Sequence, residues 1–214
     1  MTLIKICGVR TAADIEKVNT VQPDFIGFVF AKSRRWVNPE LAARLRQKLA
    51  EPTKAVGVFV DANIEEIVAL YDSGVIDLAQ LHGNEDPTFI KTLRESCSVP
   101  IIKAVQLGAT SDIGSKLHAA AAVIALADYL LLDTAAGSGK RFDWKQLREF
   151  SPMNKPWFLA GGLTPENLEE ALSYKPDGVD VSSGVETGGS KCELKLGRFV
   201  SRVRESDSRN GVPT

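Results

Sequence analysis

The chain has 214 residues, of which 44% are hydrophobic and 25% charged, as in an ordinary globular protein with room for one sizeable core. The formal net charge of -1 argues against a nucleic-acid-binding surface and against an electrostatic membrane binder. The longest apolar run, Ala119–Ala127, is too short to cross a bilayer. We therefore expect one domain over residues 1–205, followed by a flexible tail over residues 206–214, with neither nucleic acid nor membrane as a partner.

Three cysteines, Cys7, Cys97 and Cys192, are widely spaced and form no CxxC motif. Lys5 and Arg10 interrupt any apolar leader segment near the start of the chain. An odd number of scattered thiols suits a reducing compartment, and two histidines are too few for a His-rich metal site. These features predict a cytoplasmic protein with no metal centre.

Short apolar runs alternate with longer amphipathic stretches along the whole chain. The predicted strands are Leu3–Cys7, Asp24–Phe30, Lys54–Val60, Asp77–Leu81, Pro100–Val105, Tyr129–Asp133, Trp157–Ala160 and Gly178–Ser182. The predicted helices cover residues 12–20, 39–50, 63–73, 86–96, 111–124, 143–150, 165–174 and 193–204. Asn38-Pro39, Asp86-Pro87 and Thr164-Pro165 each place a capping side chain before a proline, and Asn63 with Glu66 resembles a capping box.

Strict alternation of strands and helices implies parallel strands that are joined by right-handed crossovers. Eight such units in a chain of this length predict a single-domain (β/α)₈ TIM barrel of the α/β class. The alternative is an open, doubly wound sheet. That fold usually has a glycine-rich nucleotide loop after its first strand, and Gly8-Val9-Arg10-Thr11 is not such a loop.

The first strand has a chemically mixed pattern. Ile4 and Ile6 share one face, whereas Lys5 and Cys7 share the other, and Gly8 allows a sharp turn after them. Cys7 is thus expected at the carboxyl end of the strand, where barrels carry out their chemistry. A small buried hydrophobic residue is the alternative interpretation of a lone cysteine.

Other strand ends add an acid, an imidazole and a basic pair. Asp133 is either a capping residue or a general acid, and together with Cys7 it would place an acid and a base at one cavity. His82 is an acid–base group or, as we favour, a hydrogen-bonded loop residue. Arg34 and Arg35 are either solvated charges or bidentate ligands of a carboxylate.

Small residues follow the last two strands. Gly161-Gly162 follows the seventh strand and Ser182-Ser183-Gly184 the eighth, where such barrels usually bind phosphate through backbone amides and helix amino termini. The alternative is that both segments are ordinary tight turns that do not bind phosphate. Gly137-Ser138-Gly139-Lys140 lacks the full phosphate-loop pattern, and we interpret it as a lid over the sixth strand.

Together these motifs resemble the phosphoribosylanthranilate isomerase family, from Leu3 to about Val203. The matching segments are Lys5-Ile6-Cys7-Gly8, Gly27-Phe28-Val29-Phe30, Ser33-Arg34-Arg35, Val56-Gly57-Val58-Phe59, Gln80-Leu81-His82-Gly83, Ile102-Lys103-Ala104, Leu132-Asp133, Gly137-Ser138-Gly139-Lys140 with Phe142-Asp143-Trp144, Ala160-Gly161-Gly162-Leu163, and Asp180-Val181-Ser182-Ser183-Gly184-Val185-Glu186. One departure is Lys191-Cys192, where the family usually has Lys-Asp, and this should weaken the cap of the last helix.

The resemblance implies a barrel without cofactor or metal that converts N-(5-phosphoribosyl)anthranilate to carboxyphenylamino-deoxyribulose phosphate in tryptophan biosynthesis, by an Amadori rearrangement. It further implies that Cys7 is the general base, that Asp133 is the general acid, and that Arg35 holds the anthranilate carboxylate. The remaining substrate-binding residues would be His82, Asp180, Gly161, Gly162, Ser182, Ser183 and Gly184. We expect a monomer or weak homodimer that binds a small-molecule phosphosugar. The alternatives are another phosphosugar isomerase or epimerase, and a catalytically silent binder of phosphate ligands.

The inward-facing lysine of the first strand needs a partner, because an unpaired buried charge is too costly. Asp180 on the eighth strand is the expected partner of Lys5, since these two strands meet when the barrel closes. We hypothesise that this cation favours the thiolate of Cys7 and that Lys103 adds positive charge nearby. The alternative is that Lys5 is purely structural.

Overall fold

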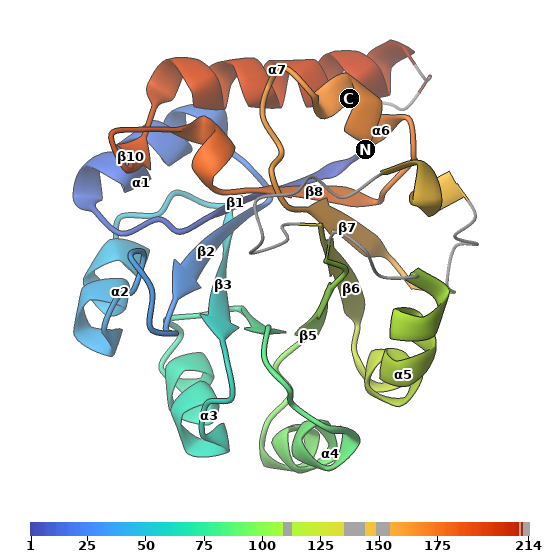
Figure 1. Cartoon of the computed structure of the whole chain (residues 1–214). Helices are drawn as coiled ribbons and strands as arrows, with labels where there is room; N and C mark the ends of the chain where they lie inside the picture. The colour runs from blue at the N-terminus through green and yellow to red at the C-terminus, as the bar shows by residue number, and fades with distance from the viewer. Residues whose placement is uncertain (109–112, 135–143, 149–154, 210, 212–214) are drawn as a thin grey trace.

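The computed structural model describes residues 1–108, 113–134, 144–148, 155–209 and 211. Within these ranges one parallel sheet closes on itself in the order β1 to β8, which confirms the predicted barrel (Figure 1). The strands are β1 (Leu3–Cys7), β2 (Phe25–Val29), β3 (Lys54–Phe59), β4 (Leu78–Leu81), β5 (Ile101–Gln106), β6 (Tyr129–Asp133), β7 (Trp157–Ala160) and β8 (Gly178–Val181). Pairing of β1 with β8 closes the barrel and sets Lys5 opposite Asp180.

Helices surround the barrel on its outer side (Figure 1). They are α1 (Ala12–Val21), α2 (Pro39–Arg46), α3 (Ile64–Asp72), α4 (Pro87–Ser96), α5 (Ile113–Leu126), α6 (Leu168–Leu172) and α7 (Glu193–Arg209), with the 3₁₀ helices η1 (Trp144–Arg148) and η2 (Ser183–Val185). A small antiparallel hairpin, β9 (Glu186–Thr187) with β10 (Ser190–Lys191), lies between η2 and α7. None of the described helices combines the length and the apolar character needed to cross a membrane.

Alternation along the strands divides the hydrophobic residues into two layers. Ile4 and Ile6 of β1 belong to the large cluster between the strands and the helices. A smaller cluster, which includes Val56, Ile102 and Phe158, fills the interior of the barrel. Successive side chains point to opposite faces of a strand, so every second residue of each strand faces the interior. The polar side chains at the strand ends therefore meet above an apolar floor.

Several helix boundaries differ from the predicted ones. Thr164-Pro165 does not start a helix, because the Asn167 side chain accepts a hydrogen bond from the Thr164 amide (2.8 Å) and donates one to Gly162 O (2.9 Å). These bonds hold the segment as a turn, and α6 begins only at Leu168. Asn63 precedes α3 without forming a side-chain cap bond, so the predicted capping box is wrong.

Two further segments differ from the predicted helices in the residues that the structure describes. Helix α2 ends at Arg46 rather than at residue 50. In the region predicted as a helix over 143–150, the described residues Trp144–Arg148 form a 3₁₀ helix. Leu147 of this 3₁₀ helix lies in the buried core, and the partly buried Trp144 packs against that core.

The last helix extends beyond the expected end of the domain. Helix α7 continues to Arg209, so the prediction of a flexible tail from residue 206 is wrong for residues 206–209. The buried carboxylate of Asp207 accepts hydrogen bonds from the amide (2.9 Å) and the hydroxyl (2.6 Å) of Thr2. The last turns of α7 are thus tied to the residue that precedes β1.

Candidate active site

A cavity of about 380 Å³ opens at the carboxyl ends of the strands, a size suited to a small ligand. Nine of the ten predicted site residues line it: Cys7, Arg35, His82, Asp133, Gly161, Gly162, Asp180, Ser182 and Ser183. Gly184 lies just outside the lining, where a Cβ atom would be only 1.8 Å from Leu163 O. The glycine at this position therefore lets the turns after β7 and β8 pack together.

Two glycines leave room for the side chains of Cys7 and Arg35. A Cβ atom at Gly27 would lie 2.8 Å from the Cys7 sulfur, so the glycine on β2 makes room for the thiol. Gly8 has a φ of +79°, and a Cβ there would lie 2.2 Å from Cδ of Arg35. The stem of Arg35 thus crosses directly over the residue that follows the thiol.

The predicted ion pair beneath the thiol is present. Lys5 is completely buried, and its Nζ lies 3.0 Å from Oδ1 of Asp180. Burial alone would lower the pKa of Lys5, but Asp180 and Cys7 outweigh it and raise that pKa. Burial raises the pKa of the Cys7 thiol, although Lys5 and Lys191 oppose this shift. The lysine therefore offsets only part of the cost of ionising a buried thiol.

The prediction that Lys103 adds positive charge near Cys7 is wrong. Ile102 and Ala104 belong to the interior cluster, so strand alternation turns Lys103 to the outer face. Its Nζ there donates to Glu85 Oε2 at 2.6 Å and to Gly83 O at 2.8 Å.

Asp133 ends β6 and is paired with an imidazole. Its Oδ2 lies 3.2 Å from Nε2 of His82, whose Nδ1 lies 2.9 Å from the amide nitrogen of Gln80. With the Gln80 amide donating to Nδ1, the neutral imidazole carries its hydrogen on Nε2 and donates to Asp133. Our preferred interpretation of His82 as a hydrogen-bonded residue thus agrees with the geometry, but its partner is the candidate acid itself.

Arg35 has a partner that we did not predict. Its Nε and Nη2 donate to the two carboxylate oxygens of Glu186, at 2.8 and 2.9 Å. Burial would raise the pKa of Glu186, but the hydrogen bonds and charges of Arg35 and Lys191 lower it to about 2. The side chain of Arg34 is 66% exposed, against 20% for Arg35, so only the second arginine belongs to the cavity.

The two turns that we predicted to bind phosphate lie at one side of the cavity. Gly161 and Gly162 both have positive φ, +94° and +67°, a backbone conformation that favours glycine. Among the described residues, neither amide has a hydrogen-bond acceptor. These two donors line the cavity beside Ser183, which begins η2. Because α6 starts at Leu168, its amino terminus does not adjoin the glycine pair as we had expected.

Besides Glu186, three further residues with contacts in the site were not among the predicted ones. Lys191 is buried and donates to the backbone oxygen of Cys7, Gln80 orients His82, and Asn167 holds Gly162. Lys191 and Glu186 lie on the β9–β10 hairpin, which is too short to give a periodic pattern in the sequence. The predicted lid at Gly137-Ser138-Gly139-Lys140 lies outside the described residues.

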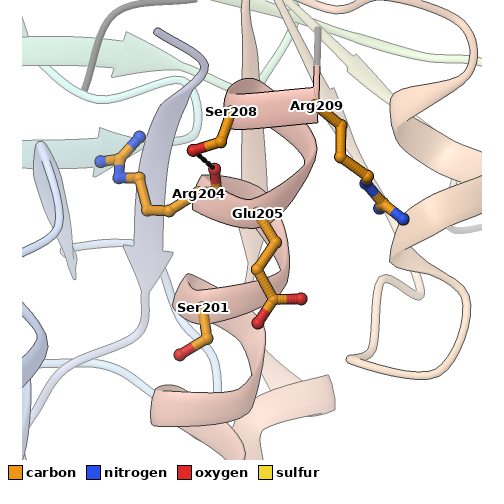
Figure 2. A pocket seen from close by; sticks show the side chains of 5 residues that line it. All are labelled: Ser201, Arg204, Glu205, Ser208 and Arg209. Carbon is orange, nitrogen blue, oxygen red and sulfur yellow. Dashed lines mark hydrogen bonds between the residues drawn. The ribbon is translucent and has the colours of Figure 1, made fainter.

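Metal-ligating side chains and a second hollow are the other features that bear on the position of the site. Among the described residues, no three His, Cys, Asp or Glu side chains gather in a way that could hold a metal ion. A second hollow lies along α7 and is lined by Ser201, Arg204, Glu205, Ser208 and Arg209 (Figure 2). It contains neither a thiol nor an imidazole, and Arg204 is bonded to Thr2 O. The cavity at the strand ends is therefore the candidate active site.

Comparison with known proteins points to one family. The profile described as N-(5'phosphoribosyl)anthranilate (PRA) isomerase matches residues 4–202. The N-(5'-phosphoribosyl)anthranilate isomerase of Streptococcus mutans is 42% identical over 208 residues, which cover 96% of this chain and 100% of the relative.

Solved structures agree with this result. The phosphoribosyl anthranilate isomerase of Thermotoga maritima has a TM-score of 0.85 at 32% identity, covering 96% of this chain and 100% of the other. A phosphoribosyl anthranilate isomerase in complex with reduced 1-(o-carboxyphenylamino)-1-deoxyribulose 5-phosphate has a TM-score of 0.83 at 31% identity, with the same coverage.

Proposed function

Because the chain belongs to the N-(5'-phosphoribosyl)anthranilate isomerase family, we propose that Cys7 and Asp133 carry out the proton transfers of that reaction. The reaction is the Amadori rearrangement of N-(5'-phosphoribosyl)anthranilate to 1-(2-carboxyphenylamino)-1-deoxyribulose 5-phosphate in tryptophan biosynthesis. The observation that carries the assignment is that a thiol from β1 and a carboxyl group from β6 line one cavity.

The chemistry needs an acid first. Asp133 protonates the furanose ring oxygen, the bond from that oxygen to C1 breaks, and the nitrogen lone pair forms the C1=N bond of a Schiff base. His82 hydrogen-bonds the same carboxyl group and can return a proton to it between turnovers. This assignment explains why the imidazole faces the acid rather than the thiol.

The base acts second. The Cys7 thiolate removes the proton from C2, the electrons of that bond form C1=C2, and those of C1=N return to nitrogen, which gives an enolamine. Tautomerisation then moves the hydroxyl proton of C2 to C1 through the solvent or the site and yields the ketone. Burial raises the pKa of Cys7, so the thiolate is a minor but strongly basic species.

Binding divides between the two sides of the cavity. Arg35 binds the anthranilate carboxylate, and the amides of Gly161, Gly162, Ser183 and Gly184 bind the phosphate. Asp180 and Ser182 also line the cavity, and we assign them contacts with the sugar. We further propose that the protein acts in the cytoplasm as a monomer or weak homodimer, which sedimentation at several concentrations tests.

The acid is tested by Asp133→Asn, which keeps the shape of the side chain but cannot supply the proton. We expect kcat, followed by the loss of anthranilate fluorescence, to fall at least ~100-fold with little change in KM. Asp61→Asn is the matched control, because Asp61 also follows a strand but does not line the cavity. A near-normal kcat in Asp133→Asn would overturn the assignment.

A further inference from the structure

We propose that Glu186 and Lys191 are positioning residues, and that Glu186 holds one edge of the Arg35 guanidinium so that the other edge is presented to the substrate carboxylate. The proposal rests on the proposed function, in which Arg35 binds that carboxylate. It adds a reason why the carboxylate occupies one fixed place relative to the thiol.

The first step concerns the donors of Arg35. A guanidinium has five N–H groups in one plane and can bind a carboxylate along either of two edges. Glu186 occupies the edge formed by Nε and Nη2, through both of its oxygens. No described residue accepts a hydrogen bond from Nη1 of Arg35. The edge formed by Nη1 and Nη2 therefore remains for a second carboxylate, and Arg35 lines the cavity.

The second step concerns the buried lysine of the hairpin. The Nζ of Lys191 lies 3.0 Å from Glu186 Oε1, 2.6 Å from Cys7 O and 3.1 Å from Ser182 O. These three oxygens use all three donors of an ammonium group. One cation thus joins the ends of β1 and β8 to the carboxylate that holds Arg35.

The third step concerns charge. With Glu186 alone, the positive charge of Arg35 would be cancelled before the substrate arrived. Lys191 supplies a second positive charge to the same carboxylate, and the exposed Arg34 supplies a third, with its Nη2 3.5 Å from Oε2. The cluster around Glu186 therefore keeps a net positive charge for an anionic ligand. Glu186 stays ionised at neutral pH, since its pKa is lowered to about 2 despite the opposing effect of burial.

The hairpin itself is held firmly in place. The backbone amide of Lys191 donates to the buried Asp14 (3.0 Å), and Lys195 Nζ donates to Glu186 O (2.7 Å). Arg10 Nη2 donates to Gly189 O (2.9 Å) in the turn between the two short strands. Side chains carried on such a support keep their direction, which is what a fixed binding edge requires.

The test measures how much the ligand carboxylate contributes to binding. Dissociation constants are measured by calorimetry for reduced 1-(o-carboxyphenylamino)-1-deoxyribulose 5-phosphate and for its analogue without the carboxyl group. The ratio of the two dissociation constants is the carboxylate factor. For the unmodified protein we expect a factor of about 10 to 100, because charge-assisted hydrogen bonds tighten binding by that much. In Glu186→Gln this factor should fall at least ~5-fold, while the affinity for the analogue stays within ~2-fold.

Glu85→Gln is the matched control, because Glu85 is also a buried carboxylate that pairs with a lysine, but it contacts neither Arg35 nor Cys7. It should leave the carboxylate factor unchanged. Equal weakening of both ligands in Glu186→Gln would show a merely structural role and overturn the proposal. The proposal would also be overturned if the carboxylate factor were unchanged in Glu186→Gln but lost in Arg35→Ala. That result would leave the proposed function intact.

A carboxylate factor near one in the unmodified protein, or one that survives Arg35→Ala, would instead reject Arg35 as the carboxylate ligand, and the positioning role with it. Lys191→Met should reduce the factor and also lower kcat, since the contact with Cys7 O is lost as well. A folded Lys191→Met protein with normal values of both would remove Lys191 from the proposal. If that variant does not fold, Lys191→Gln keeps a donor without the charge and allows the same comparison.

Discussion

Two thiols of this molecule stand in opposite surroundings. Cys7 ends β1 inside the barrel, and burial raises its pKa even though Lys5 and Lys191 are close by. Cys192 lies directly before α7, where hydrogen bonds from the Lys195 amide and the Thr187 side chain lower its pKa. Nearby positive charge is therefore not sufficient to make a thiolate. At Cys7 the effect of burial outweighs both the charge and the hydrogen bond of Lys5, whereas at Cys192 hydrogen bonds to the sulfur have the largest effect.

The comparison separates reactivity from catalytic position. At neutral pH the more ionised sulfur is Cys192, which does not line the active-site cavity. Cys7 is less ionised, but it lines the same cavity as the carboxyl group of Asp133. A raised pKa also makes its thiolate a stronger base. In the proposed mechanism the position of Cys7 therefore matters more than the fraction of its sulfur that is ionised at neutral pH.

The largest expected effect comes from removing each sulfur in turn. Cys7→Ala should lower kcat by at least ~100-fold with little change in KM, because it deletes the base without touching the binding groups. Cys192→Ala should keep kcat within ~2-fold. Steady-state assays of both purified variants decide the matter, and a comparable loss in the two would mean that the distinction between the cysteines is wrong.

The placement of Cys7 could be predicted from strand alternation and barrel closure, whereas the opposite pKa shifts of the two thiols could not. Both rules depend only on residue spacing, and they placed Cys7, Asp133 and the pair of Lys5 with Asp180. The same alternation turns Lys103 outward, because its neighbours Ile102 and Ala104 on β5 face the interior of the barrel.

Other parts depend on contacts that no local pattern reveals. Glu186 and Lys191 contact partners that are far away in the sequence, Arg35 and the backbone of Cys7. The start of α6 was missed because the side chain of Asn167 bonds back into the preceding turn. Such side-chain to backbone bonds compete with helix formation and override the signal of a proline.

An effect of intermediate size concerns ionisation at Cys7. Labelling by iodoacetamide, followed by mass spectrometry across pH, should modify Cys192 at lower pH than Cys7. Lys5→Met should move the Cys7 profile to higher pH, because Lys5 opposes the rise of its pKa, whereas Asp180→Asn should move it to lower pH. The Cys192 profile is the internal control in each experiment. A Cys7 profile unchanged in both folded variants would show that the pair is purely structural.

The smallest effect concerns the cap of α7. Cys192 O accepts the first intrahelical bond, from the Leu196 amide, so Cys192 is the N-cap residue. An aspartate there accepts amide hydrogen bonds more strongly and carries a full charge at the positive end of the helix. Cys192→Asp should therefore stabilise the fold by about 0.5 kcal/mol, or about 1–2 °C in Tm.

The pH dependence of this gain tests its cause. The pKa of Cys192 is lowered in the folded protein, so its thiolate adds stability above the unfolded pKa, and that stability is lost as pH falls through the folded pKa. The aspartate is ionised throughout this range. The gain in Tm of Cys192→Asp over the wild type should thus be larger at pH 6 than at pH 9. The hydroxyl of Cys192→Ser does not ionise in this range, so the Tm of that variant should fall relative to the wild type as pH rises. Melting curves in which Cys192→Asp gains equally at both pH values would mean that the thiolate contributes nothing to the cap.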